Sequence, residues 1–129
     1  HGDGSTGFLA LVNLTTMQLV GTPRTENGIK TAALMVLGGK RYVVAGYPDA
    51  IVDGNTGAGQ VQVLEVDTAT GIGNSVMTLH DAQPEGNQKF GRSVAVMPFD
   101  GKPLIVVAAD NEVFTYFRTN LYEETRAGR

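Results

Sequence analysis

Short apolar stretches separated by glycine-rich turns recur along the whole chain. The clearest group spans residues 90–117, where three apolar segments are separated first by Pro98 with a turn at 99–103 and then by a turn at 110–111. Residues 104–109 are continuously apolar and rich in β-branched side chains, which at this length favours a strand buried on both faces over a helix. Because the connections are short, the simplest topology pairs consecutive strands antiparallel.

The rest of the chain shows the same pattern, and no segment has the period of an amphipathic helix. Polar or glycine-containing loops are expected at residues 24–30, 47–59 and 81–89, and residues 121–129 are compatible with an edge strand, a helical turn or a frayed tail. The remaining strands are expected at residues 8–14, 17–20, 31–37, 41–46, 60–66 and 76–79.

Two internal repeats connect these segments. Residues 3–7 (Asp-Gly-Ser-Thr-Gly) match residues 53–57 (Asp-Gly-Asn-Thr-Gly), and residues 31–46 match residues 93–109 with a spacing of 62. We name the four strands of one unit A to D. The first unit then has strands C and D, the second has A, B, C and D, and the third has A, B and C, while the sequence does not decide whether the third unit also has a strand D. Four-stranded antiparallel units repeating every ~40–50 residues are typical of propeller blades.

The chain is therefore predicted to be all-β, with about two and a half four-stranded blades of a β-propeller; the alternative is a β-sandwich with a similar number of strands. A partial blade is expected at residues 1–23, a complete blade at 24–82 with its long loop at 47–59, and a second blade at 83–129. A closed ring needs roughly four to eight blades. Further sequence or other chains are expected to supply the remaining blades.

Composition and charge narrow the possible partners. The 129 residues suffice for one domain, and 17 glycines with five prolines suit many short strands joined by tight turns. A formal charge of −3 without a basic cluster argues against a nucleic-acid surface. No apolar run approaches the ~20 residues that span a bilayer, so no transmembrane segment is expected. The chain has no cysteine, which excludes disulfides and thiolate chemistry.

Three short motifs occur in an order that resembles the FG-GAP repeats of integrin α-subunit propellers and their bacterial relatives. Phe90-Gly91 with the strand segment at 93–96 is similar to the phenylalanine-glycine opening of such a repeat. Residues 44–49 (Val-Ala-Gly-Tyr-Pro-Asp) are similar to its Gly-Ala-Pro segment, and residues 57–63 to the Gly-x-Val-x-Val strand that follows. The chain departs from the family at residues 28–29 (Gly-Ile) and 108–110 (Ala-Ala-Asp).

This resemblance implies a repeat protein of the cell surface or extracellular space, whose propeller acts in adhesion or protein–protein interaction. Many members carry an acidic calcium loop between strands A and B, but residues 38–40 and 100–102 offer at most one carboxylate beside a lysine. Such a loop cannot supply the six to eight oxygen ligands that Ca²⁺ takes. No cofactor is therefore expected, apart from a weak possibility of calcium at the long loop.

The candidate binding residues lie in or next to that long loop: Tyr47, Asp49, Asp53 and Asn55. Tyr47 is expected in the loop beside Pro48, where surface loops present binding residues. Two carboxylates and an amide form a weak cation site, whereas the alternative is a solvated loop that uses Asp and Asn to make turns.

No catalytic residues are expected. His80 and Asp81 are adjacent, and neighbouring residues on a strand point to opposite faces, so they do not readily form an acid–base pair. The preferred hypothesis is a non-enzymatic module that binds a protein partner or further blades of the same propeller. The alternative is a lectin-like propeller that binds a glycan, which ranks second because loops of unequal length do not repeat one pocket at each blade junction.

Overall fold

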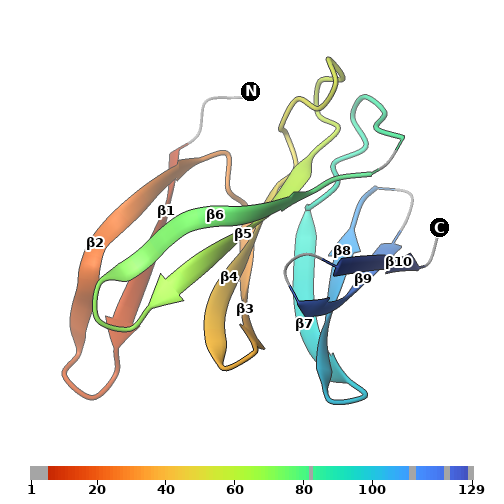
Figure 1. Ribbon diagram of the computed structural model, residues 1–129. Helices are drawn as coiled ribbons and strands as arrows, with labels where there is room; N and C mark the ends of the chain where they lie inside the picture. Colours follow the sequence, from red (N-terminus) through yellow and green to blue (C-terminus); the bar gives the residue numbers. More distant parts are fainter. Residues whose placement is uncertain (1–5, 82, 111–112, 121–122, 128–129) are drawn as a thin grey trace.

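The chain folds into three separate antiparallel sheets, one of two strands and two of four strands (Figure 1). The computed structural model describes residues 6–81, 83–110, 113–120 and 123–127, and within these ranges it contains no helix. The all-β prediction is therefore confirmed. The strands are β1 (Thr6–Asn13), β2 (Gln18–Asn27), β3 (Thr31–Leu37), β4 (Lys40–Tyr47), β5 (Gln60–Asp67), β6 (Gly71–Leu79), β7 (Ser93–Phe99), β8 (Lys102–Ala108), β9 (Val113–Asn120) and β10 (Glu123–Ala127).

Each four-stranded sheet is a simple meander in chain order, β3-β4-β5-β6 and β7-β8-β9-β10, and β1 pairs with β2 in the third sheet. The matching units of the sequence therefore lie in different sheets, and the segment at residues 47–59 is not helical. The last unit also has its fourth strand, because β10 pairs antiparallel with β9. Of the alternatives left open for residues 121–129, the described residues 123–127 form an edge strand.

The repeat with a spacing of 62 residues is reproduced in the hydrogen-bonding register. Thr31 pairs with Gly46 in the β3–β4 hairpin, and Ser93 pairs with Ala108 in the β7–β8 hairpin. Every other pair of the two hairpins follows at the same spacing, down to the glycine turns that connect their strands. The other repeat, which matches residues 3–7 to residues 53–57, includes residues 3–5, and these lie outside the described residues.

Two strands extend further than expected, and each contains a proline. β2 continues from the expected strand at 17–20 through Pro23 to Asn27, so residues 24–27 of the expected polar loop belong to this strand. Pro23 lies in the bulge of β2 between the pairs Leu11–Val20 and Leu9–Arg24, where the ladder is interrupted and no amide is needed. β7 likewise passes through Pro98, because β7 is the edge strand of its sheet.

The middle sheet carries an apolar cluster on each face, so the two clusters lie between successive sheets. One cluster joins its β3, β4 and β5 side chains to those of β7 and β8, with Phe90 fully buried at its centre. The other joins Leu64, Val66 and Val43 of the middle sheet to Leu9 and Leu11 of β1. The three sheets therefore stack in chain order, each on the next.

The segment at residues 104–109 differs in detail from its prediction. Ile105 and Val107 are fully buried and face the middle sheet, whereas Leu104, Val106 and Ala108 are only half-buried on the opposite face. The segment is a strand, as expected, but it is not buried on both faces.

Candidate binding platform

Two long loops lie side by side at one end of the molecule (Figure 1). The first, residues 48–59, connects β4 to β5, and the second, residues 80–92, connects β6 to β7. Backbone bonds join them: the amides of Asn87, Lys89 and Phe90 donate to the carbonyls of Thr56, Gly57 and Ala58 at 2.9, 2.8 and 2.9 Å. We call the described residues of these two loops the loop platform.

Glycine makes this close approach possible. Gly59 forms a parallel bridge with Phe90, and a Cβ atom on Gly59 would lie 2.1 Å from the Phe90 carbonyl oxygen. Gly59 also has a φ of +90°, which disfavours any side chain. On the other side of the bridge Gly91 comes equally near, since its Cβ would lie 2.7 Å from the Gln60 carbonyl oxygen. The phenylalanine-glycine motif thus anchors the second loop, with the ring in the core and the glycine against the neighbouring sheet.

A buried polar network holds the second loop in shape. Asp81 is almost fully buried, and its carboxylate accepts hydrogen bonds from the Gln88 side-chain amide at 2.6 Å and from the Gln83 backbone amide at 3.1 Å. The Gln88 side-chain carbonyl in turn accepts from the backbone amide of Glu85 at 3.3 Å. Buried polar groups satisfied in this way give the loop one defined conformation.

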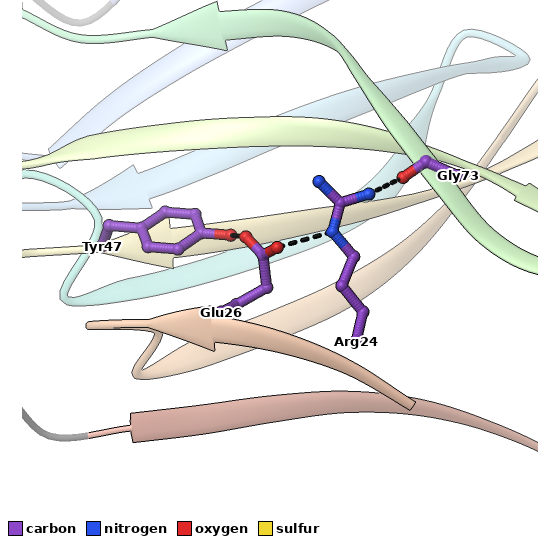
Figure 2. Close-up of polar contacts among 4 residues, drawn as sticks. All are labelled: Arg24, Glu26, Tyr47 and Gly73. Atoms are coloured by element: carbon purple, nitrogen blue, oxygen red, sulfur yellow. Dashed lines mark hydrogen bonds and ion pairs between the residues drawn. The ribbon is translucent and has the colours of Figure 1, made fainter. Parts of the chain in front are cut away.

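Tyr47 does not lie in the loop, as was expected, but at the end of β4 with 6% of its surface exposed. Its hydroxyl donates to the Glu26 carboxylate at 2.5 Å, and the Arg24 Nε donates to the same carboxylate at 2.5 Å (Figure 2). Arg24 also donates to the backbone carbonyl of Gly73 on β6. The network therefore joins β2 to β4 and β6, between two sheets and away from the platform surface.

The environment of Tyr47 affects its acidity. Burial raises the pKa of the Tyr47 hydroxyl well above its ordinary value, and the hydrogen bond to Glu26 and the negative charge of Glu26 raise it further. Tyr47 consequently remains a neutral hydrogen-bond donor at physiological pH.

The other three candidate residues have separate roles in the platform. Asp49 is half-buried and forms an ion pair with Lys89 of the second loop. The Asn55 amide donates to the Val52 and Asp53 carbonyls at 3.3 and 3.4 Å, within the tight turn at the tip. Asp53 lies in that turn with a φ of +51° and an exposed side chain. The four candidates are thus close in sequence but are not gathered around one ligand.

No metal site is formed by these groups. Within the described ranges, no three His, Asp or Glu side chains are grouped so that they could hold a metal ion. Asp49 already faces a lysine, and the side-chain nitrogen of Asn55 donates to carbonyls of the turn. Asn55 is the one of these candidates whose side chain bonds within the turn, as the alternative expectation describes for Asn in loops.

Residues that sequence reasoning did not single out form the exposed surface of the platform. Ile51 has 66% of its surface exposed, although it is a large apolar side chain, and Glu85 is exposed on the second loop. Asp53, two positions after Ile51, is also exposed, so the platform has an apolar point with an acidic residue close to it in the chain. An isoleucine inside a loop of Asp, Ala, Val and Gly is the one signal that would have indicated this in the sequence.

The histidine at the start of the second loop is part of its local structure. His80 Nδ1 lies 2.8 Å from the backbone carbonyl oxygen of Asp81, to which it donates, while the Asp81 carboxylate accepts from Gln88 and Gln83. Each group therefore has a bonding role in the loop.

A depression of about 350 Å³ lies at the end of the middle sheet away from the loop platform, beside the β3–β4 and β5–β6 turns. Lys40 and Arg41 line it together with Glu65 and Asp67, so its charges are of both signs. The pKa of Asp67 is lowered because its carboxylate accepts hydrogen bonds from the backbone amides of Ala69 and Thr70. This carboxylate therefore serves the turn, and the depression lacks the single-sign charge that selects an ionic ligand.

The part of the chain that the structure describes contains no helix long and apolar enough to cross a membrane. Comparisons with protein-family models, with curated proteins and with solved structures gave no match to this chain.

Proposed function

We propose that this chain is a non-enzymatic interaction module of the FG-GAP β-propeller type, part of a larger propeller or assembly, which binds another protein through the loop platform. The stacking of the sheets supports the propeller arrangement over a sandwich. In a two-sheet sandwich each sheet is covered on one inner face only, whereas here the middle sheet has an apolar cluster on each face. The resemblance to adhesion modules favours an extracellular or cell-surface location.

The observation that carries the binding proposal is the joining of a loop within the middle sheet to the loop that connects this sheet to the last one, by backbone hydrogen bonds. Three amide–carbonyl bonds between residues 56–58 and 87–90, together with the ion pair of Asp49 and Lys89, make one continuous surface. A surface held in one conformation loses little conformational entropy on binding, which favours affinity. Exposed Ile51, next to acidic Asp53, is suited to a protein surface with an apolar recess and basic residues around it.

Glycan binding remains the second candidate. Sugar sites in proteins stack aromatic rings against the ligand, but Tyr42 and Tyr47 are both buried between sheets. The connections at equivalent places of the two repeats also differ in length: residues 48–59 separate β4 from β5, whereas only residues 109–112 separate β8 from β9. A pocket repeated at each sheet junction is therefore not favoured. These observations rank a protein partner above a sugar.

The binding proposal is tested with the immobilised chain and two matched variants. Ile51→Glu places a charge at the apolar point of the platform, and Leu14→Glu places the same charge at an exposed leucine in the β1–β2 turn. We expect a protein that is retained by the wild-type chain and by Leu14→Glu, and that is lost with Ile51→Glu. The partner is then identified by mass spectrometry and its affinity measured with purified components.

A glycan array probed with the same three proteins separates the alternatives. Binding to a defined glycan that Ile51→Glu leaves unchanged, without any platform-dependent protein partner, would overturn the proposal. The native mass from light scattering tests the assembly: a particle several times the 13.6 kDa of the chain agrees with blades supplied by other chains.

A further inference from the structure

The two-stranded sheet corresponds to the second half of a complete four-stranded sheet. Asn13 at the end of β1 and Asp67 at the end of β5 each accept two backbone hydrogen bonds through Oδ1, from residues two and three positions further on. Four positions after each of them, Met17 and Gly71 have positive φ values of 60° and 106°. The β1–β2 turn is thus built like the β5–β6 turn, which makes β1 and β2 equivalent to the third and fourth strands.

Among the residues that the structure describes, no equivalent of the first two strands lies beside β1. β5 pairs with β4 on one edge and with β6 on the other, whereas in the described part of the chain β1 pairs only with β2. β1 consequently has a free edge of unpaired backbone groups, which is a template for pairing with another strand.

The face of β3 that would meet those two strands is exposed and apolar. The repeat of 62 residues makes Ala32 equivalent to Val94 and Leu34 equivalent to Val96. Val94 is 8% exposed and Val96 packs on the same cluster, because β3 contacts β7 and β8. Ala32 is exposed and Leu34 has 69% of its surface exposed. The same face of the same strand is therefore covered in one repeat and open in the other.

We propose that the free edge of β1 and the open face of β3 together accept a two-stranded antiparallel hairpin from a partner polypeptide. One strand of the hairpin adds to the β1 edge, and the other covers Ala32 and Leu34. The proposal rests on the repeat arrangement used for the proposed function, but it is independent of the loop platform. Addition of strands to a sheet edge is an established way of recognising a polypeptide.

The covered repeat defines the chemistry of the hairpin. There, β3 and β4 contribute one apolar face to the shared cluster, with small and large side chains alternating as Ala33, Met35, Tyr42 and Val44. The partner hairpin therefore needs apolar residues at every second position on one face, and a tight turn between its strands. The apolar face of the hairpin determines which sequences can bind, while the backbone of β1 provides the hydrogen bonds.

A peptide of residues 29–48, which contains the β3–β4 hairpin sequence, is the probe. Labelled with a fluorophore, it is titrated with the 129-residue chain and its anisotropy measured, and a peptide of the same composition in scrambled order is the control. We expect saturable binding of the hairpin peptide only. Amide hydrogen exchange of the chain should slow at least tenfold within β1 when the peptide is bound.

Two variants on one strand localise the binding. Leu34→Glu should weaken peptide binding at least tenfold, because it places a charge in the covered interface. Val36→Glu is the matched control: Val36 lies on the same face of β3 and is 60% exposed, but its equivalent, Pro98, stays exposed in the covered repeat. Its affinity for the peptide should remain within twofold of the wild-type value.

Several outcomes would overturn the proposal. The first is that amide exchange in β1 does not slow when the peptide is added. The second is that Leu34→Glu and Val36→Glu change the affinity for the peptide equally. The third is that the chain dimerises with increasing concentration and protects β1 without peptide, which would make a second copy the occupant. Ile51→Glu should bind the peptide normally. A chain that binds the peptide but has no platform-dependent partner would thus contradict only the proposed function, and the reverse result would contradict only this inference.

Discussion

Gly59 lies directly against the backbone of Phe90, and this contact joins the two four-stranded sheets. The two residues form a parallel bridge, and the Phe90 amide donates to the carbonyl of Ala58, next to Gly59, at 2.9 Å. The loop platform begins at this bridge, so its geometry depends on a backbone approach that only glycine permits.

Substitution of Gly59 by alanine should therefore loosen the junction between the sheets. The new Cβ would lie 2.1 Å from the Phe90 carbonyl oxygen, at a residue with a φ of +90°. We expect a loss of roughly 2–5 kcal/mol in the free energy of unfolding from left-handed strain and steric overlap together. Urea denaturation followed by circular dichroism measures this loss.

Gly54→Ala is the control for backbone strain alone. Gly54 has a φ of +80°, but no atom lies within 4 Å of its Cβ position. It should cost only about 1–2 kcal/mol, the strain of a left-handed residue. Equal losses for the two variants would show that the close approach to Phe90 does not exist in solution.

The Phe90 ring should be the main apolar anchor of the same junction. Phe90 is fully buried in the cluster between the sheets, so Phe90→Ala should lower the free energy of unfolding by about 3–5 kcal/mol. Phe8→Ala removes the same atoms from a side chain that is 65% exposed. This variant should change the free energy of unfolding by about 0.5 kcal/mol or less. Thermal unfolding of both variants in parallel gives the comparison, and a large effect at Phe8 would indicate that its face is covered in solution.

Local signals were sufficient to predict much of this fold. The β3–β4 and β7–β8 hairpins could be placed because glycine turns and apolar alternation are properties of neighbouring residues. Whether a strand can continue through Pro23 or Pro98 depends on a bulge and on an edge position, which are fixed only when the sheet has formed. Sequence reasoning therefore ended these strands too early.

The candidate site was harder to predict, because its contacts join distant residues. Tyr47 precedes a proline and an aspartate, and this pattern predicts a loop residue. Its hydroxyl, however, donates a hydrogen bond to Glu26 on the neighbouring sheet. Asp49 likewise pairs with Lys89, forty positions away. The chain order indicates that two loops exist, and only the stacking of the sheets shows that they are joined.

The Tyr47–Glu26 contact should make stability depend on alkaline pH. The pKa of Tyr47 is raised in the folded chain, so its stabilising contribution is complete below the ordinary tyrosine pKa of about 10 and is lost as the pH rises above that value. In that range the free energy of unfolding should fall by up to about 1.4 kcal/mol per pH unit from this group. Urea denaturation at several pH values from 8 to about 11.5 measures the slope.

Tyr47→Phe separates this effect from the titration of lysines. The variant lacks the hydroxyl, so the additional slope above pH 10 should disappear. At neutral pH it should be less stable by about 1.5–3 kcal/mol, since a hydrogen bond to a partly buried carboxylate is lost. An unchanged alkaline slope in Tyr47→Phe would mean that the buried hydroxyl does not control it.

The Asp81–Gln88 pair should control the order of the second loop more than the stability of the sheets. Asp81→Ala leaves the Gln88 side-chain amide and the Gln83 backbone amide without this carboxylate. The cost should be roughly 1–3 kcal/mol, because the Gln88 side chain is buried. Amide exchange at Gln83 and in residues 85–89 should accelerate, whereas exchange in β4 and β5 should change only with global stability. Glu85→Ala, at an exposed position of the same loop, should leave amide exchange unchanged both in the loop and in β4 and β5. If Asp81→Ala accelerates exchange equally in the loop and in the sheets, Asp81 supports the whole fold, and the loop platform has no separate source of order.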